Sequence, residues 1–198
     1  MKPILVTYAT MAGSTAEVAL VIAEEITRGT LQVEVLPLSK VAKLDRYDAV
    51  VLGGPMIMGW HRAALRFLRK NRAAFQHIPF AVFVTAMSLT ESQDPGFAEL
   101  PVYVDEKLPK APQNADRLNF RERYAQLENY LRPILAATRP AKPASIGVFG
   151  GRLEYGRLKW WAVLYAMLII QASAGDKRNL PAIRQWAGGL PALLTTGS

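Results

Sequence analysis

The chain has 198 residues, of which 51% are hydrophobic, and it carries a formal net charge of +8. This length and apolar content suffice for one sizeable core, so we expect a single domain over residues 1–198. The absence of cysteine excludes disulfides, thiol redox chemistry and Cys-ligated metal or iron–sulfur sites. With only two histidines, His61 and His77, we expect no metal site built on histidine either.

The surplus of Lys and Arg favours an anionic partner such as a membrane surface or an acidic small molecule. A solvated basic surface without a specific partner is the alternative. The basic residues are not interleaved with aromatic residues in one segment, which argues against nucleic acid. The residues after Lys2 enter a strand pattern, and no small-residue cleavage site follows. We therefore expect a cytoplasmic protein without a signal peptide.

The stretch Ile4–Glu17 joins a strand to a helix through a small polar turn. β-Branched residues precede the turn, and a helical apolar stripe begins at Val18. The free N–H groups of a helix N-terminus, with the hydroxyls of Thr10, Ser14 and Thr15, suit a phosphate. Without a lysine, the turn is not a nucleotide-triphosphate loop of the GxxxxGK[ST] type. An ordinary capped strand–helix turn is the alternative to a phosphate site.

Strand and helix patterns alternate along the first half of the chain. The predicted elements are a helix from Val18 to near Gly29, a strand over 31–35, a strand over 48–53, a helix from Ala63 to Phe75, and a strand from Phe80 to Thr85. This rhythm predicts right-handed βαβ units and a parallel sheet. Ligands bind beyond the carboxyl ends of such strands, where the loops at Thr10–Thr15, Gly54–His61 and Ala86–Leu89 are expected to emerge.

The second half departs from this rhythm, and we predict an insertion at about residues 89–143. Within it, loops are expected at Ser92–Gly96 and Leu108–Asn114, followed by one helix from Leu118 to Ala137. One face of that helix is predicted to carry Phe120, Tyr124, Leu127, Leu131 and Ile134. A last strand over Ser145–Phe149 and a closing helix over Pro181–Leu194 complete the prediction.

The run Trp160–Ile170 contains no polar residue. As a helix it would span about 16 Å, which is too short to cross a bilayer. A core helix behind the sheet is one interpretation. The other is contact with anionic lipid headgroups, because basic residues precede two tryptophans. The residues of that predicted membrane contact are Arg152, Arg157, Lys159, Trp160 and Trp161.

Several of these motifs resemble those of a known family. The turn Thr10-Met-Ala-Gly-Ser-Thr15 resembles the T-x-T-G-x-T phosphate loop of flavodoxins, with Ala12 in place of the middle threonine. The apolar strand that ends in Gly53-Gly-Pro55 matches their second flavin-binding loop. The pieces Gly150–Tyr155 and Ser173–Asp176 look like the C-terminal part of the flavodoxin-type, menaquinone-dependent protoporphyrinogen IX dehydrogenases. The resemblance covers most of residues 1–88 and 144–190.

The resemblance implies a flavodoxin-like, doubly wound α/β fold. Its five-stranded parallel sheet would have helices on both faces, with the long insertion before or within the last strand. It also implies FMN as the cofactor. The implied phosphate ligands are Thr10, Met11, Ala12, Gly13, Ser14 and Thr15. The residues implied to flank the ring are Pro55, Met56, Ile57, Met58, Gly59 and Trp60 on one side, and Thr85, Ala86, Met87 and Ser88 on the other.

Only Trp60 offers an aromatic ring in these two loops, whereas electron-carrying flavodoxins usually stack aromatic residues on both faces of the flavin. A methionine-lined, half-open ring leaves room for a substrate or quinone. Packing of Trp60 within the loop is the alternative. The basic residues that follow would favour an anionic reduced flavin, although a solvated helix face also explains them. They are Arg62, Arg66, Arg69, Lys70 and Arg72.

The resulting hypothesis is an FMN-dependent oxidoreductase that passes hydrogen equivalents from a reduced organic substrate to a quinone at the membrane surface. The resemblance suggests protoporphyrinogen as the donor, with Arg152, Arg157 and Lys159 meeting its propionates. No catalytic base is evident. His61 is the one titratable candidate, and a capping role is the alternative for it. The competing hypotheses are a basic flavodoxin that carries single electrons to an acidic partner, and a flavin-free binding module of the same fold.

Overall fold

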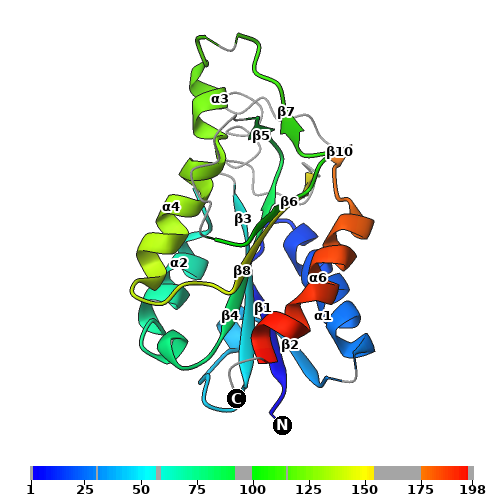
Figure 1. The fold of residues 1–198 in the computed structure, drawn as a ribbon, viewed down its shortest axis with the longest axis vertical. Helices are drawn as coiled ribbons and strands as arrows, with labels where there is room; N and C mark the ends of the chain where they lie inside the picture. The colour runs from blue at the N-terminus through cyan, green and yellow to red at the C-terminus, as the bar shows by residue number, and fades with distance from the viewer. Residues whose placement is uncertain are drawn as a thin grey trace.

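A six-stranded parallel sheet forms the centre of the computed structural model, which describes residues 2–29, 31–56, 59–91, 100–114, 116–153 and 175–195 (Figure 1). The strand order is β2-β1-β3-β4-β8-β6. The strands are β1 (Ile4–Tyr8), β2 (Val33–Pro37), β3 (Ala49–Met56), β4 (Phe80–Ala86), β6 (Val102–Val104) and β8 (Ser145–Gly150).

The central strands are apolar on both faces, because helices cover the sheet from both sides. Every residue of β3, β4 and β8 is buried. Alternate side chains of β3 enter different cores: Ala49 and Val51 pack on one face, and Val50 and Leu52 on the other. This two-sided burial explains why these strands read as continuous apolar runs in the sequence.

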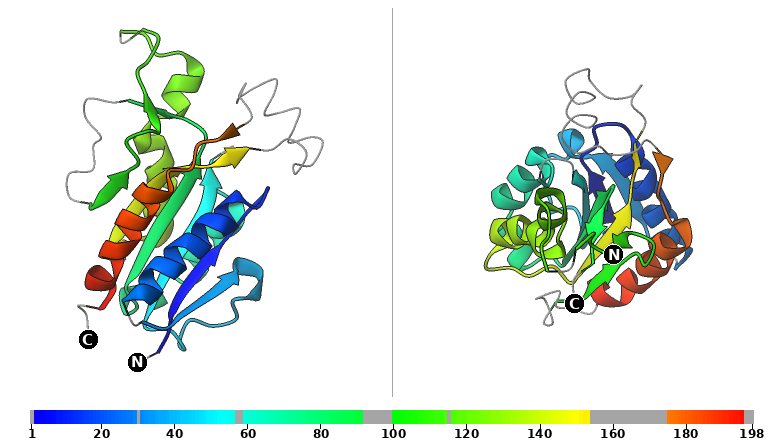
Figure 2. Two further views of the ribbon diagram at one scale, coloured as in Figure 1. Left: turned by 90° about the vertical axis from the view of Figure 1, so that its right-hand side faces the viewer. Right: turned by 90° about the horizontal axis from the view of Figure 1, so that it is seen from above.

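Among the described residues, two helices cover each face of the sheet (Figures 1 and 2). Helices α1 (Ser14–Arg28) and α6 (Leu180–Thr195) lie on one face, where Trp186 of α6 meets Phe149 edge-to-face at 5.4 Å between ring centroids. Helices α2 (Arg62–Lys70) and α4 (Leu127–Thr138) lie on the other. Short 3-10 turns, η1 (Leu38–Lys40) and η2 (Ala74–Gln76), follow β2 and α2.

The parallel sheet, the helix after the first loop and the closing helix are confirmed. The strands predicted at 31–35, 48–53, 80–85 and 145–149 correspond to β2, β3, β4 and β8. The helix predicted from Ala63 to Phe75 ends earlier, at Lys70. Asn71 is the C-cap: its backbone N–H makes the last helical bond to the carbonyl of Phe67 at 3.1 Å, and its side-chain amide donates to the same carbonyl at 2.9 Å.

The sheet has six strands where we predicted five. The additional strand, β6, comes from the segment 89–143 and pairs in parallel with β8 at the sheet edge. The same segment contributes α4, the crossover helix between β4 and β8, and a small peripheral unit. That unit consists of β5 (Leu89–Thr90), β7 (Pro109–Lys110) and α3 (Phe120–Tyr124), and β5 pairs in parallel with β7.

The single helix predicted from Leu118 to Ala137 is wrong, because the structure divides it into α3 and α4. Thr90 donates to two carbonyl groups at the end of α3. Its N–H donates to the carbonyl of Ala125, and its hydroxyl donates to the carbonyl of Glu122. Gln126 then adopts an extended conformation and begins α4. Of the five residues predicted on one face, Phe120 is 70% exposed and Tyr124 is also exposed. Leu127, Leu131 and Ile134 are buried.

Among the residues that the structure describes, no helix has both the length and the apolar character needed to cross a bilayer. The apolar run Trp160–Ile170 and the loop predicted at Ser92–Gly96 lie outside the described residues.

Candidate functional site

The three predicted loops emerge at the same edge of the sheet, which confirms this part of the prediction. The strand registers align Tyr8 with Gly53, Met56 with Ala86, and Ala86 with Gly150. The carboxyl ends of β1, β3, β4 and β8 therefore meet at one edge. This is the position at which open α/β sheets bind their ligands.

The first loop, Thr10–Thr15, leads directly into helix α1. Gly13 is the N-cap and adopts a left-handed conformation, with φ of 93°. Its N–H donates to the Thr10 hydroxyl at 2.9 Å, and its carbonyl accepts from the N–H groups of Ala16 and Glu17. No side chain caps α1, and the N–H groups of Ser14 and Thr15 have no acceptor within the described part of the chain. The helix N-terminus thus keeps donors for an anion.

Two contacts join the first loop to the neighbouring strands. The hydroxyls of Thr15 and Thr85 are hydrogen-bonded at 2.9 Å and are buried, which links α1 to the end of β4. At the end of β8, a Cβ placed on Gly151 would stand 3.6 Å from the Ser14 hydroxyl oxygen and 3.6 Å from the Ala86 carbonyl oxygen. The phosphate-loop candidates therefore lie against the ends of both β4 and β8.

In the second loop, Trp60 packs inward. Its indole is only 2% exposed, lies in the core between the sheet and helices α2 and α4, and donates to the Gly54 carbonyl at 3.0 Å. This is the loop-packing arrangement that the sequence left open. Pro55 and Met56 are buried at the end of β3, and Gly59 has φ of 90°. Ile57 and Met58 lie outside the described residues.

The third loop is fixed from two directions. Thr85 and Ala86 are the last residues of β4, Met87 is half-buried, and Ser88 is exposed. The Lys177 ammonium donates to the Met87 carbonyl at 2.7 Å, and the Tyr130 hydroxyl donates to the Ser88 carbonyl at 2.7 Å. Burial raises the pKa of Tyr130 to about 12, so its hydroxyl remains a donor across the physiological range.

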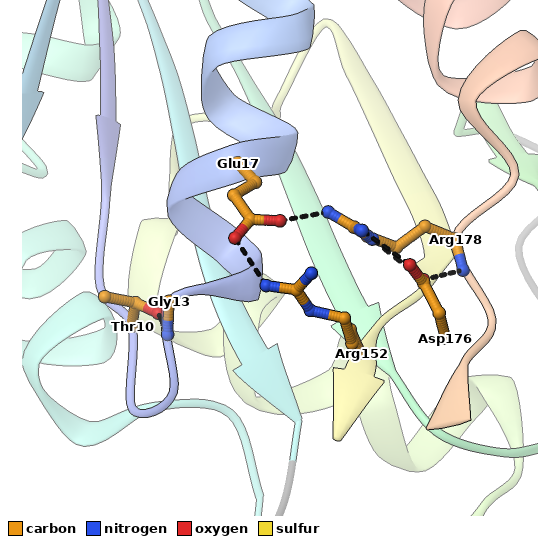
Figure 3. Close-up of polar contacts among 6 residues, drawn as sticks. All are labelled: Thr10, Gly13, Glu17, Arg152, Asp176 and Arg178. Atoms are coloured by element: carbon orange, nitrogen blue, oxygen red, sulfur yellow. Dashed lines mark hydrogen bonds and ion pairs between the residues drawn. The ribbon is translucent and has the colours of Figure 1, made fainter. Parts of the chain in front are cut away.

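A cluster of four charged side chains lies beside the first loop (Figure 3). Glu17, in the first turn of α1, accepts from Arg152 at 2.6 Å and from Arg178. Arg178 also pairs with Asp176 through two nitrogen–oxygen contacts of 2.8 and 2.5 Å. Hydrogen bonding to Arg178 lowers the pKa of Asp176 to about 2. Both arginines are largely buried, with side-chain exposures of 20% and 15%.

Two short strands, β9 (Arg152–Leu153) and β10 (Gly175–Asp176), pair antiparallel beside Glu17; Arg152 begins β9, and Arg178 lies two residues after β10. Sequence analysis quoted Arg152 and Asp176 but did not link either to Glu17, and it did not mention Arg178. No local pattern pairs residues that are 135 and 161 positions apart. The guanidinium of Arg152, which was predicted to contact lipid headgroups, instead donates to Glu17. The other residues of that prediction, Arg157, Lys159, Trp160 and Trp161, lie outside the described part of the chain.

His61 caps helix α2, which was the alternative given for it. Its ring nitrogen Nδ1 accepts from the N–H of Ala63 at 3.2 Å. Burial, followed by the charge of Arg66, lowers the pKa of His61 below its ordinary value. A protonated ring cannot accept at Nδ1, so the capping bond requires the neutral form.

We expect the protein to lose stability as the pH falls below about 6.5, because the unfolded chain then binds a proton at His61 that the folded chain resists. His61→Asn keeps an acceptor at the cap. It should reduce this loss, as measured by urea unfolding at about pH 7.5 and pH 5.5. His77→Asn, at an exposed histidine, is the matched control and should behave as the wild type. Equal acid sensitivity of His61→Asn and wild type would contradict this role.

The first loop fits the phosphate of a mononucleotide by its own geometry. Gly13 adopts a left-handed conformation, and its N–H donates to the Thr10 hydroxyl. The N-terminus of α1 has no side-chain cap and carries a partial positive charge. The loop contains no acidic residue, and the carboxylate of the following turn is neutralised by arginines. These features suit a dianion bound by backbone donors.

Comparison with known proteins shows what the chain is similar to. The chain is 22% identical over 175 residues to the protoporphyrinogen IX dehydrogenase [quinone] of Escherichia coli strain K12, covering 87% of this chain and 81% of that protein. Among solved structures, it is similar to a short-chain flavodoxin associated with a PDU bacterial microcompartment, at 15% identity, full coverage of both chains and a TM-score of 0.49. A WrbA-like flavodoxin from Agrobacterium tumefaciens gives 12% identity, full coverage of both and a TM-score of 0.47.

The family assignment follows from the sequence profile of the flavodoxin domain, which matches residues 5–122. The matched part includes the first loop and the first five strands of the central sheet along the chain, of which β1 begins one residue before it. Five neighbouring strands, β2-β1-β3-β4-β8, also have the 2-1-3-4-5 order of flavodoxin-like folds. The chain belongs to the flavodoxin domain family, and FMN is the cofactor that this membership indicates.

Proposed function

We propose that this protein is an FMN-dependent oxidoreductase that transfers hydrogen equivalents from a reduced tetrapyrrole of the protoporphyrinogen type to a quinone. The observation that carries the proposal is the similarity to the E. coli protoporphyrinogen IX dehydrogenase [quinone], which extends over 87% of this chain and 81% of that protein. The bound flavin supplies the two-electron chemistry, and the chain supplies binding, orientation and access.

We assign the phosphate of FMN to the first loop, at Thr10, Met11, Ala12, Gly13, Ser14 and Thr15. The uncapped start of α1 and the left-handed Gly13 support this assignment. We assign one side of the ring to the loop from Pro55 to Trp60, and the other side to Thr85, Ala86, Met87 and Ser88. Trp60 serves this site by supporting Gly54 from the core rather than by stacking on the ring.

The proposed ring site favours a small-molecule partner. Trp60 is buried, and the loop Thr85–Ser88 contains no aromatic residue. With no aromatic side chain from these described residues covering the ring, a planar substrate or quinone has access to it. Lys177 and Tyr130 hold the backbone of the third loop in place, which keeps this access open.

An electron carrier is the second candidate, and the exposed basic face of α2 favours it. Arg62, Arg66, Arg69 and Lys70 are all exposed, and α2 carries no acidic residue. Such a face suits an acidic protein partner. The same charge also suits an anionic membrane surface that contains the quinone, with the segment beyond Arg152 as a further proposed contact.

The test begins with purification, the absorbance spectrum of bound flavin, and anaerobic incubation with protoporphyrinogen IX and a soluble quinone. We expect porphyrin fluorescence to rise only when the quinone is present. When reductant is added in small portions, we expect the flavin to pass directly from the oxidised to the two-electron-reduced form. Flavin-stripped protein is the control. Separate one-electron steps without porphyrin formation would favour the electron carrier and contradict the dehydrogenase.

A further inference from the structure

Glu17 creates an electrostatic conflict at the proposed phosphate site. It lies in the first turn of α1, the helix whose N-terminus the proposed function assigns to a dianionic phosphate. An acidic side chain in a first turn interacts favourably with the helix dipole. The same negative charge repels a second anion at the same helix end. A neighbouring positive charge is therefore needed before a phosphate binds well there.

Arg152 and Arg178 supply this positive charge, and their side chains are directed at the Glu17 carboxylate (Figure 3). Each oxygen of the Glu17 carboxylate accepts from one arginine: Oε1 from Arg152 at 2.6 Å, and Oε2 from Arg178. Asp176 holds Arg178 in place through a bidentate pair. The formal charges of the four charged side chains drawn in Figure 3 sum to zero. The arginines are directed at Glu17, so their effect on the phosphate acts through that carboxylate.

We propose that Arg152 and Arg178 neutralise Glu17 and thereby allow helix α1 to bind the phosphate of FMN. This inference rests on the proposed function, because it concerns the cofactor site assigned there. Arg152 and Arg178 are positioning residues, because both guanidinium groups donate to the Glu17 carboxylate. The consequence is a phosphate site whose affinity depends on the docking of β9 and β10 against α1.

The placement of the two strands supports this dependence. Arg152 and Asp176 are register partners in the β9–β10 pair, and this pair places Arg152, together with Arg178 just after β10, beside Glu17. The backbone of Gly151, one residue before Arg152, lies against Ser14 in the first loop. Linkage then requires the reverse effect: bound FMN stabilises the docking of β9 and β10 by the same factor.

The test compares the affinities of the flavin-stripped protein for FMN and for riboflavin, which lacks the phosphate. We expect Arg152→Gln to weaken FMN binding about fivefold at low salt and to leave riboflavin binding unchanged. The loss should shrink at high salt, where the charge of Glu17 is screened. The double variant Glu17→Gln/Arg152→Gln removes both charges and should restore FMN affinity to within about twofold of wild type.

Arg184→Gln is the matched control. Arg184 of α6 pairs with Glu24 and Glu25 on the same helix α1, at 2.8 and 3.3 Å, about three turns away from the phosphate end. It should change neither affinity. Equal weakening of FMN in the single and double variants would overturn the proposal, because Arg152 would then act on the phosphate directly. Equal weakening of riboflavin would also overturn it, in favour of a purely structural role. A wild-type protein that does not prefer FMN over riboflavin would overturn the proposed function as well.

Discussion

Replacing Gly150 by alanine is expected to lower the free energy of unfolding by about 3 kcal/mol. Gly150 ends β8, and a Cβ on it would stand 1.9 Å from the carbonyl oxygen of Lys177. The obstructing atom belongs to the backbone, so rotation of a side chain cannot relieve the clash. The whole connection from β10 to α6 would have to move away from the sheet.

This movement would break several contacts at once. The N–H of Lys177 donates to the Gly151 carbonyl at 3.0 Å, and the Asn179 side chain donates to the buried Asp105 at 2.8 Å. For a chain of this length, the loss corresponds to a melting temperature about 6–12 °C lower, measurable by calorimetry or circular dichroism.

Gly188→Ala is the control for this prediction. Gly188 lies inside helix α6, and no atom stands within 4 Å of a Cβ placed on it. Alanine there should raise the free energy of unfolding by about 0.5–1 kcal/mol, because glycine is a poor residue for a helix interior. A Gly150→Ala protein as stable as wild type would show that residues 175–179 do not pack on β8 as the structure describes.

The core of the fold could be predicted because its signals are local. β3, β4 and β8 are buried on both faces, so each appears as an unbroken apolar run. The first loop is bounded by a β-branched strand and an amphipathic helix, and its residues are consecutive. Once the strands are taken as parallel, the meeting of the three loops at one edge follows from topology alone.

The errors occurred where distant contacts override local preference. The apolar period of residues 118–137 continues without interruption, yet Thr90 takes the carbonyls that would have continued α3. The strand β6 has only three half-buried residues and is fixed by pairing with β8, so its own sequence carries little signal. Trp60 is the last residue of the predicted flavin loop from Pro55 to Trp60. The inward position of its ring depends on the Gly54 carbonyl and on the core, neither of which the loop sequence shows.

The charged cluster also escaped prediction, but for a different reason. Glu17, Arg152 and Arg178 are each unremarkable in their local sequence, and a first-turn glutamate is an ordinary feature of helices. Their relation depends on bringing β9 and β10 to the N-terminus of α1, which is a property of the complete fold. The candidate phosphate ligands could therefore be predicted from consecutive residues, whereas the charged side chains around them could not.

Gly13→Ala is expected to weaken FMN binding about fivefold to thirtyfold and to affect riboflavin much less. The φ of 93° at Gly13 places it in the left-handed region, where an L-residue with a Cβ costs about 1–2 kcal/mol. In the free protein, the loop can relieve this strain by shifting away from its present shape. Binding of the phosphate must then restore that shape, so the strain energy appears in the dissociation constant.

Gly29→Ala provides the matched control, because Gly29 ends the same helix with a φ of −82° that alanine adopts without strain. Its Cβ would make only an ordinary contact of 3.5 Å with the Ile26 carbonyl oxygen. Titration followed by quenching of flavin fluorescence gives both dissociation constants for each variant. If Gly13→Ala lowers the melting temperature but binds FMN as tightly as Gly29→Ala does, the strain is carried equally in the free and bound states. The loop conformation would then contribute nothing to phosphate binding, and the assignment of Thr10–Thr15 as the phosphate site would lose its geometric basis.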